Sequence, residues 1–123
     1  MRSALLDKAG RTPPAERPDA PFDCGNLTIC GMGMRDVSSD QGFPRALQVH
    51  RDGVAVAKPP SAEVVKLNDQ HAFLQLAEGD GLRVGDVIEF GISHPCTCLD
   101  RYRVIFGVDE TDRVVRAIPT FFG

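Results

Sequence analysis

The chain has 123 residues, a length that suits one domain. Hydrophobic residues make up 42% and charged residues 25%, which is ordinary for a soluble globular protein. The formal net charge is -3 and no basic run occurs, so nucleic acid is a poor candidate partner. No apolar stretch approaches the roughly 18 residues of a membrane span, and the amino terminus lacks the apolar core of a signal peptide. We therefore expect a cytoplasmic protein with no membrane partner.

The amino-terminal part of the chain is expected to lie outside the ordered domain. Residues 3–9 can form one or two helical turns that stop at Gly10. Residues 11–21 contain four prolines, which exclude a helix interior or a central strand. We predict a Pro-rich arm or linker over residues 1–26 and a β domain over residues 27–123.

From residue 27 onward, short apolar runs alternate with turn signals. Asp52-Gly53 between two such runs is a strong hairpin signal. About seven short strands at this spacing predict an all-β fold, a compact β-barrel or sandwich, with no long helix. The candidate strands cover residues 27–30, 46–50, 54–58, 64–67, 72–76, 87–92, 101–108 and 113–118.

The cysteines of a cytoplasmic chain are expected to be reduced, so metal or catalytic roles outrank a disulfide framework. Cys96 and Cys98 would pair with difficulty on one extended strand, where their Cα atoms would lie about 6.6 Å apart. No motif surrounds Cys24 or Cys30, and we expect them in the core or on the surface.

The segment from His94 to Cys98 is the sharpest chemical signal. If it is extended, His94, Cys96 and Cys98 point to one face, and imidazole and thiolate are preferred zinc ligands. Pro95 places the segment at a strand end, an edge or a bulge, where functional groups reach a cleft. The spacing therefore predicts a metal site at these three residues. The alternatives are a buried cysteine with a hydrogen-bonded histidine, or a thiol site without metal.

Two other polar segments are weaker candidates. The loop over residues 31–40 is rich in glycine, and Arg35 could pair there with a carboxylate or phosphate, ordered by Asp36 or Asp40. An ordinary surface connection explains this loop more simply, because it matches neither a Walker loop nor a dinucleotide fingerprint. His71 follows Asn-Asp-Gln and is explained by a tight turn.

The order of four blocks, however, resembles one known domain. The blocks are Gly-Met-Gly-x-Arg-Asp-x-Ser-x-Asp (31–40), Leu-Asn-Asp-Gln-His-Ala (67–72), Val-Gly-Asp-x-Ile-x-Phe-Gly-Ile-Ser-His-Pro-Cys-Thr (84–97) and Val-x-x-Ile-Pro-Thr-Phe-Phe (115–122). Together they resemble the carboxy-terminal β domain of the D-threonine aldolase and D-serine dehydratase family, whose closer branch is called D-amino-acid deaminase-like. These are pyridoxal-phosphate enzymes of the alanine-racemase fold type, and the resemblance covers residues 27 to 122.

The resemblance implies specific roles. His94 and Cys96 would hold a divalent metal, commonly zinc, beside the cofactor, where it contacts the substrate hydroxyl during dehydration or retro-aldol cleavage. His71 would line the active site or carry protons, and is the catalytic candidate. Supporting roles are implied for Arg35, Asp36 and Asp40. Cys98 departs from the family, in which threonine is more usual.

The resemblance also implies that pyridoxal phosphate reaches this domain only through a partner. The cofactor lysine of the family lies in a (β/α)8 barrel of about 250 residues, which a 123-residue chain cannot contain. Lys8, Lys58 and Lys66 stand in no similar context. We expect a barrel domain or subunit as partner, a homodimer, and no catalysis by this chain alone. The alternative is a stand-alone module that binds zinc or a partner without catalysing a reaction.

Overall fold

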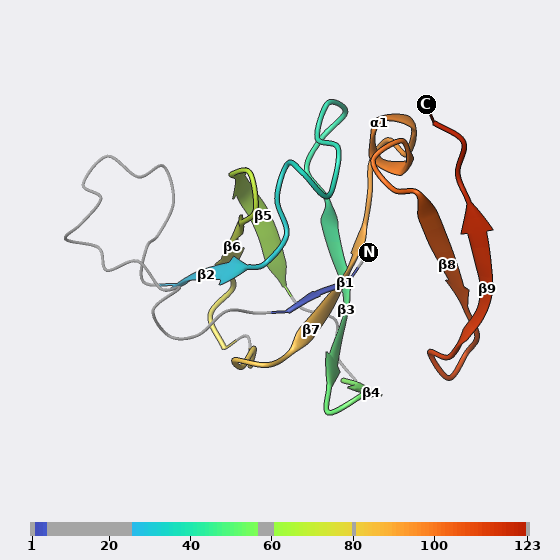
Figure 1. Cartoon of the computed structure of the whole chain (residues 1–123). Helices are drawn as coiled ribbons and strands as arrows, with labels where there is room; N and C mark the ends of the chain where they lie inside the picture. Colours follow the sequence, from blue (N-terminus) through green and yellow to red (C-terminus); the bar gives the residue numbers. More distant parts are fainter. Residues whose placement is uncertain (1, 5–25, 57–60, 80, 123) are drawn as a thin grey trace.

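The computed structural model describes residues 2–4, 26–56, 61–79 and 81–122, and in these residues strands predominate (Figure 1). The predicted all-β class is confirmed. The elements in chain order are β1 (Arg2–Ala4), β2 (Leu27–Cys30), β3 (Arg45–Arg51), β4 (Val54–Ala55), β5 (Ala62–Leu67), β6 (Ala72–Leu76), β7 (Val87–Gly91), α1 (Cys96–Leu99), β8 (Val104–Val108) and β9 (Val114–Pro119).

The strands form two antiparallel sheets. The larger sheet follows the order β1-β7-β3-β5-β6-β2, and β4 adds to β3. Its two ends, β1 and β2, do not pair with each other, so the sheet is not a closed barrel. The smaller sheet consists of β8 and β9 alone, and Figure 1 shows this hairpin to one side of the larger sheet.

The buried core includes one face of strand β7. In β7, Ile88 and Phe90 are buried, whereas Val87, Glu89 and Gly91 are partly exposed, as the period of two along a strand requires. Burial of such large apolar side chains is the main favourable term in folding. The remaining buried cluster comprises Cys30, Met32, Val37, Val49, Ala62, Val64, Leu67, Ala72, Leu74 and Cys98.

The predicted hairpin at Asp52-Gly53 is confirmed. Both residues have positive φ, 52° and 79°, as a type I′ turn requires, and the turn joins β3 to β4. Asp and Gly tolerate this left-handed backbone better than most residues.

An ion pair with a buried carboxylate fixes the end of this hairpin near the start of β7. Asp86 is only 1% exposed, and its carboxylate accepts hydrogen bonds from Arg51 Nε and Nη2, both at 2.7 Å. The backbone N–H of Arg83 donates to the same carboxylate at 2.8 Å. The hydrogen bonds from Arg51 hold the pKa of the Asp86 carboxyl below its ordinary value.

Several local predictions differ from the structure. Arg2–Ala4 forms strand β1 on the edge of β7, so the predicted helical turn does not begin at Ser3. This edge pairing also means that the arm predicted over residues 1–26 contributes a strand to the sheet; its Pro-rich stretch and Cys24 lie outside the described residues. Residues 96–99, predicted as extended, form the helical turn α1.

Candidate functional site

A single loop, residues 31–42, joins the segments that the sequence marked as candidates. On one side it docks on the turn at residues 68–71, where Met34 N donates to Asn68 O at 2.8 Å and Arg35 N donates to Asp69 O at 3.0 Å. A Cβ at Gly33 would lie 2.4 Å from the backbone atoms of Asn68 and Asp69. Only glycine permits this close approach, which explains its place in the motif.

On its other side the loop packs against the chain that follows β7. The Asp36 carbonyl accepts hydrogen bonds from the Tyr102 hydroxyl at 2.7 Å and from the Cys98 thiol at 3.4 Å. Arg101 donates to the carbonyl of Val37 at 3.2 Å. Burial raises the pKa of Tyr102 to about 12. The loop therefore lies between the turn at 68–71 and the segment 94–102, and holds both.

His94 is positioned by this loop. Its Nδ1 lies 2.7 Å from Asp40 Oδ2, and Thr97 Oγ1 donates to Asp40 Oδ1 at 3.3 Å. The Ser38 hydroxyl donates to the His94 carbonyl and fixes the backbone beneath the ring. The hydrogen bond from His94 holds the pKa of the Asp40 carboxyl below its ordinary value.

The two cysteines do not share a face, so the predicted extended geometry is wrong. Pro95 has helical φ and ψ of -76° and -26°, and its carbonyl accepts from the N–H groups of Cys98 and Leu99. Successive side chains of a helix turn by about 100°, which separates residues two apart. Cys96 is exposed, whereas Cys98 is 2% exposed and turned toward the loop.

The three predicted metal ligands are therefore not assembled as one set. Within residues 2–4, 26–56, 61–79 and 81–122, no group of three or more His, Cys, Asp and Glu side chains is placed to hold a metal ion. His94 and Cys96 remain partly or fully exposed and can still offer one ligand each to a metal whose other ligands come from outside these residues.

The predicted catalytic residue, His71, is exposed beside the same loop. It lines an open hollow of about 560 Å³, whose other walls are residues of the loop and of the turn. These walls are Met34, Arg35, Asn68, Asp69 and Gln70. The Asp36 carboxylate accepts a hydrogen bond from Gly33 N at 2.8 Å and so shapes the loop.

Four contributing side chains were missed from the sequence: Ser38, Thr97, Arg101 and Tyr102. The strand predicted over residues 101–108 includes Arg101 and Tyr102, although β8 begins at Val104. The polar residues Asp100 and Arg101 interrupt the apolar pattern ahead of Val104. This interruption is the signal in the sequence that the strand begins later than residue 101.

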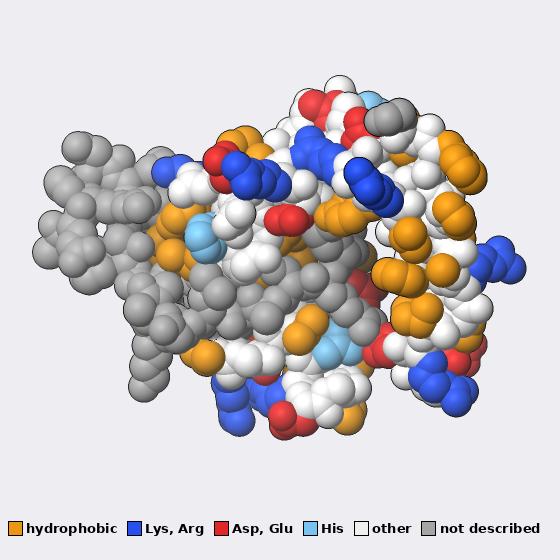
Figure 2. All heavy atoms as spheres, in the orientation of Figure 1, with side chains coloured by type: hydrophobic (Ala, Val, Ile, Leu, Met, Phe, Trp, Pro, Cys, Tyr) orange, Lys and Arg blue, Asp and Glu red, His pale blue; other side chains and the backbone are white. Residues whose placement is uncertain are grey.

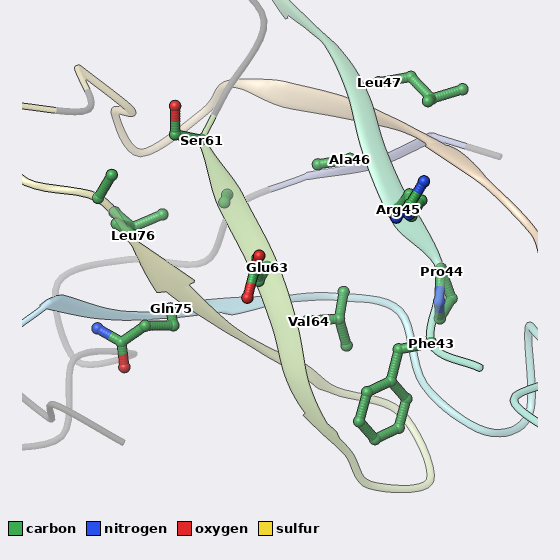
Figure 3. A pocket seen from close by; sticks show the side chains of 12 residues that line it. Phe43, Pro44, Arg45, Ala46, Leu47, Ser61, Glu63, Val64, Gln75 and Leu76 are labelled. Atoms are coloured by element: carbon green, nitrogen blue, oxygen red, sulfur yellow. The ribbon is translucent and has the colours of Figure 1, made fainter.

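A larger groove lies elsewhere, between β3 and β5. These strands pair only at Arg45 and Glu63 and then diverge. The groove has a volume of about 810 Å³, and Figure 3 shows Phe43, Leu47 and Val64 around it. None of the sequence-predicted site residues lines it, so it is separate from the candidate site. In the described part of the chain, no helix has the length and apolar character needed to cross a membrane.

Comparison with known proteins identifies the domain. Residues 15–108 match the family model described as "Putative serine dehydratase domain". The crystal structure of D-threonine aldolase from Filomicrobium marinum has the same fold, with a TM-score of 0.65 at 16% sequence identity. The superposition covers 96% of this chain and 26% of that chain. No curated protein sequence matches significantly. The resemblance is thus confirmed, and the chain belongs to the serine dehydratase domain family.

Proposed function

We propose that this chain is the carboxy-terminal β domain of a pyridoxal-phosphate-dependent D-amino-acid deaminase, dehydratase or aldolase. In this proposal His94 and Cys96 contribute metal ligands to an active site that a (β/α)8 barrel completes. The observation that carries the proposal is the hydrogen bond of 2.7 Å between His94 Nδ1 and Asp40 Oδ2, in a domain that belongs to this family.

His94 and Cys96 each carry a group that zinc can take as a ligand. With Nδ1 of His94 engaged by Asp40, Nε2 is the ring atom left to coordinate a metal. The Cys96 side chain is exposed and supplies a thiolate, which zinc prefers. When bound, the metal would act as a Lewis acid on a substrate hydroxyl, and pyridoxal phosphate would be the electron sink. Cys98 is turned inward and is not part of this proposed pair.

The hairpin β8–β9 supports the existence of a partner. Every residue of β9 is exposed, although most are apolar, and Figure 2 shows hydrophobic side chains gathered along this edge of the molecule. Large exposed apolar patches mark interaction surfaces. The exposed apolar side chains here are Val104, Phe106, Val108, Val114, Val115, Ile118, Phe121 and Phe122.

The partner we propose for this face is the barrel, on the same or another subunit of a cytoplasmic homodimer. The chain spans 26% of the Filomicrobium marinum D-threonine aldolase, so most of that protein has no counterpart in it. His71, in the hollow beside the loop, would line the shared site, and the domain alone would not catalyse the reaction.

Zinc titration by calorimetry tests the metal role. We expect binding to the purified chain that His94→Gln and Cys96→Ser each weaken by tenfold or more, whereas Cys98→Ser leaves it unchanged. Equal binding by all four proteins would contradict the proposal.

Cofactor chemistry tests the rest of the proposal. Pyridoxal phosphate added to the chain should give no Schiff-base absorbance, and D-serine and D-threonine should not be consumed. Turnover by the pure chain would contradict the need for a barrel.

A stand-alone zinc module is the second candidate function. Such a site normally takes four ligands from the protein. It would require Cys98 to turn outward and join His94 and Cys96, and a loss of zinc binding in Cys98→Ser would favour it.

A further inference from the structure

We propose that Asp40 is a positioning residue that fixes the His94 imidazole with its proton on Nδ1 and its Nε2 lone pair directed outward to a ligand. This inference rests on the proposed role of His94 as a metal ligand, and it assigns a task to the loop over residues 31–42. Asp40 would set the chemistry of the histidine without itself binding the metal.

The carboxylate is held on two sides, so it can hold the ring. Asp40 Oδ2 lies 2.7 Å from His94 Nδ1, and Oδ1 accepts from the Thr97 hydroxyl at 3.3 Å. Thr97 belongs to α1 and His94 precedes it, so the Asp40 carboxylate joins the helix to the segment before it.

Ser93 and the backbone of His94 are also hydrogen-bonded to the loop. The Ser38 hydroxyl donates to the His94 carbonyl, and the Ser93 hydroxyl donates to the Gly42 carbonyl at 2.8 Å. The loop therefore contacts segment 93–97 on both sides of Asp40. Rotation of the ring away from Asp40 would lose the carboxylate contact while the backbone stays in place.

The chemistry of the contact determines which nitrogen is free. An ionised carboxylate only accepts hydrogen bonds, so Nδ1 must carry the proton that it donates to Asp40. In the neutral imidazole the other nitrogen then has its lone pair exposed, which is the form that a metal requires. A carboxylate on the far ring nitrogen is the usual support of a metal-binding histidine, and its loss costs about 10–100-fold in metal affinity.

Asp40→Asn separates this role from simple packing. An asparagine side chain has the same shape, but its amide can donate to Nδ1 as well as accept from it. The variant therefore removes the preference for the Nδ1–H form while keeping the fold. Asp100→Asn is the matched control, because Asp100 is an exposed carboxylate at the end of α1 with no described contact to His94.

The test combines two readouts on the full chain. Long-range ¹H–¹⁵N correlation spectra of the metal-free protein at pH 8 report the His94 tautomer directly. We expect the Nδ1–H form in the unmodified protein and in Asp100→Asn, and a shift toward Nε2–H in Asp40→Asn. Zinc titration should show an affinity at least tenfold lower for Asp40→Asn, with Asp100→Asn unchanged. Circular dichroism confirms that each variant is folded.

Two results would overturn the inference: an Nε2–H ring in the unmodified protein, or unchanged tautomer and zinc affinity in Asp40→Asn. Failure of the proposed function looks different. If His94→Gln binds zinc as tightly as the unmodified chain, the metal role of His94 is wrong, while the tautomer spectra still decide whether Asp40 fixes the ring.

Discussion

Tyr102 shows how one side chain can connect two parts of the site. Its hydroxyl donates to the Asp36 carbonyl in the loop at 2.7 Å, and its ring packs against the core cluster. The same carbonyl accepts from the buried Cys98 thiol. Ionising the phenol would remove the donated proton and place a charge in a partly buried position. The residue is therefore expected to resist ionisation.

The first prediction concerns the pKa of Tyr102, which burial raises to about 12 from an ordinary value of 10.0. The chain has one tyrosine and no tryptophan, so phenolate absorbance near 295 nm reports this residue alone. Since the folded state holds the proton more tightly than the unfolded state, stability should fall as pH rises from about 10 to 12.

The measurement is an absorbance titration of the native chain beside one in urea. A native midpoint near 10 would contradict the burial of the hydroxyl. Tyr102→Phe is the control, because it removes the absorbance change, and its stability should depend less on pH in that range.

At the scale of elements, the loop over residues 31–42 organises the site, and Gly33 is its contact point with the turn. We predict that Gly33→Ala lowers the free energy of unfolding by about 2 kcal/mol or more, because the new Cβ would lie 2.4 Å from backbone atoms of Asn68 and Asp69. Backbone cannot move aside as a flexible side chain can.

Urea denaturation followed by circular dichroism measures this loss, and Gly81→Ala is the matched control. Gly81 has open space around its Cβ position and no positive φ, so its substitution should change stability by no more than about 0.5 kcal/mol. Equal stabilities of the two variants would mean that the loop does not dock on the turn as described.

Elements with a strong local pattern could be predicted from the sequence. The strand at Leu27–Cys30 and the Asp52-Gly53 turn follow from local apolar runs and from turn chemistry, and both occur as expected. The helical turn α1 was not predicted, because the spacing of His94, Cys96 and Cys98 was taken as that of an extended strand. Pro95 instead begins a helical turn, a position in which proline is common.

The contacts of the site could be predicted only in part. The resemblance placed His94, Cys96 and the loop in one domain of one family, which the family match confirms. The pairing of Asp40 with His94 joins residues 54 positions apart and depends on how loop and strand pack. The inward turn of Cys98 likewise depends on where the loop places the Asp36 carbonyl.

At the scale of the whole molecule, the domain divides into a well-packed sheet and a weakly supported hairpin. β7 lies between β1 and β3 and buries Ile88 and Phe90. Among the described residues, β8 and β9 pair only with each other, and the hydrogen bond from Thr120 N to Arg103 O at 2.9 Å extends this pairing beyond the strand ends. An isolated two-stranded hairpin is at best marginally stable in water.

The last prediction follows from this difference and is read by hydrogen exchange. In the isolated chain, backbone amides of β8 and β9 should exchange through local opening, well before those of β6 and β7, whose exchange requires global unfolding. The expected result is a much lower protection of the amides in the hairpin than in the sheet. Low concentrations of urea should change the exchange rates of the hairpin amides little. Addition of a barrel subunit that covers the apolar face should raise protection in the hairpin first. Equal protection in hairpin and sheet would show that the hairpin is stable alone, and would remove its exposed apolar face as a reason to expect a partner.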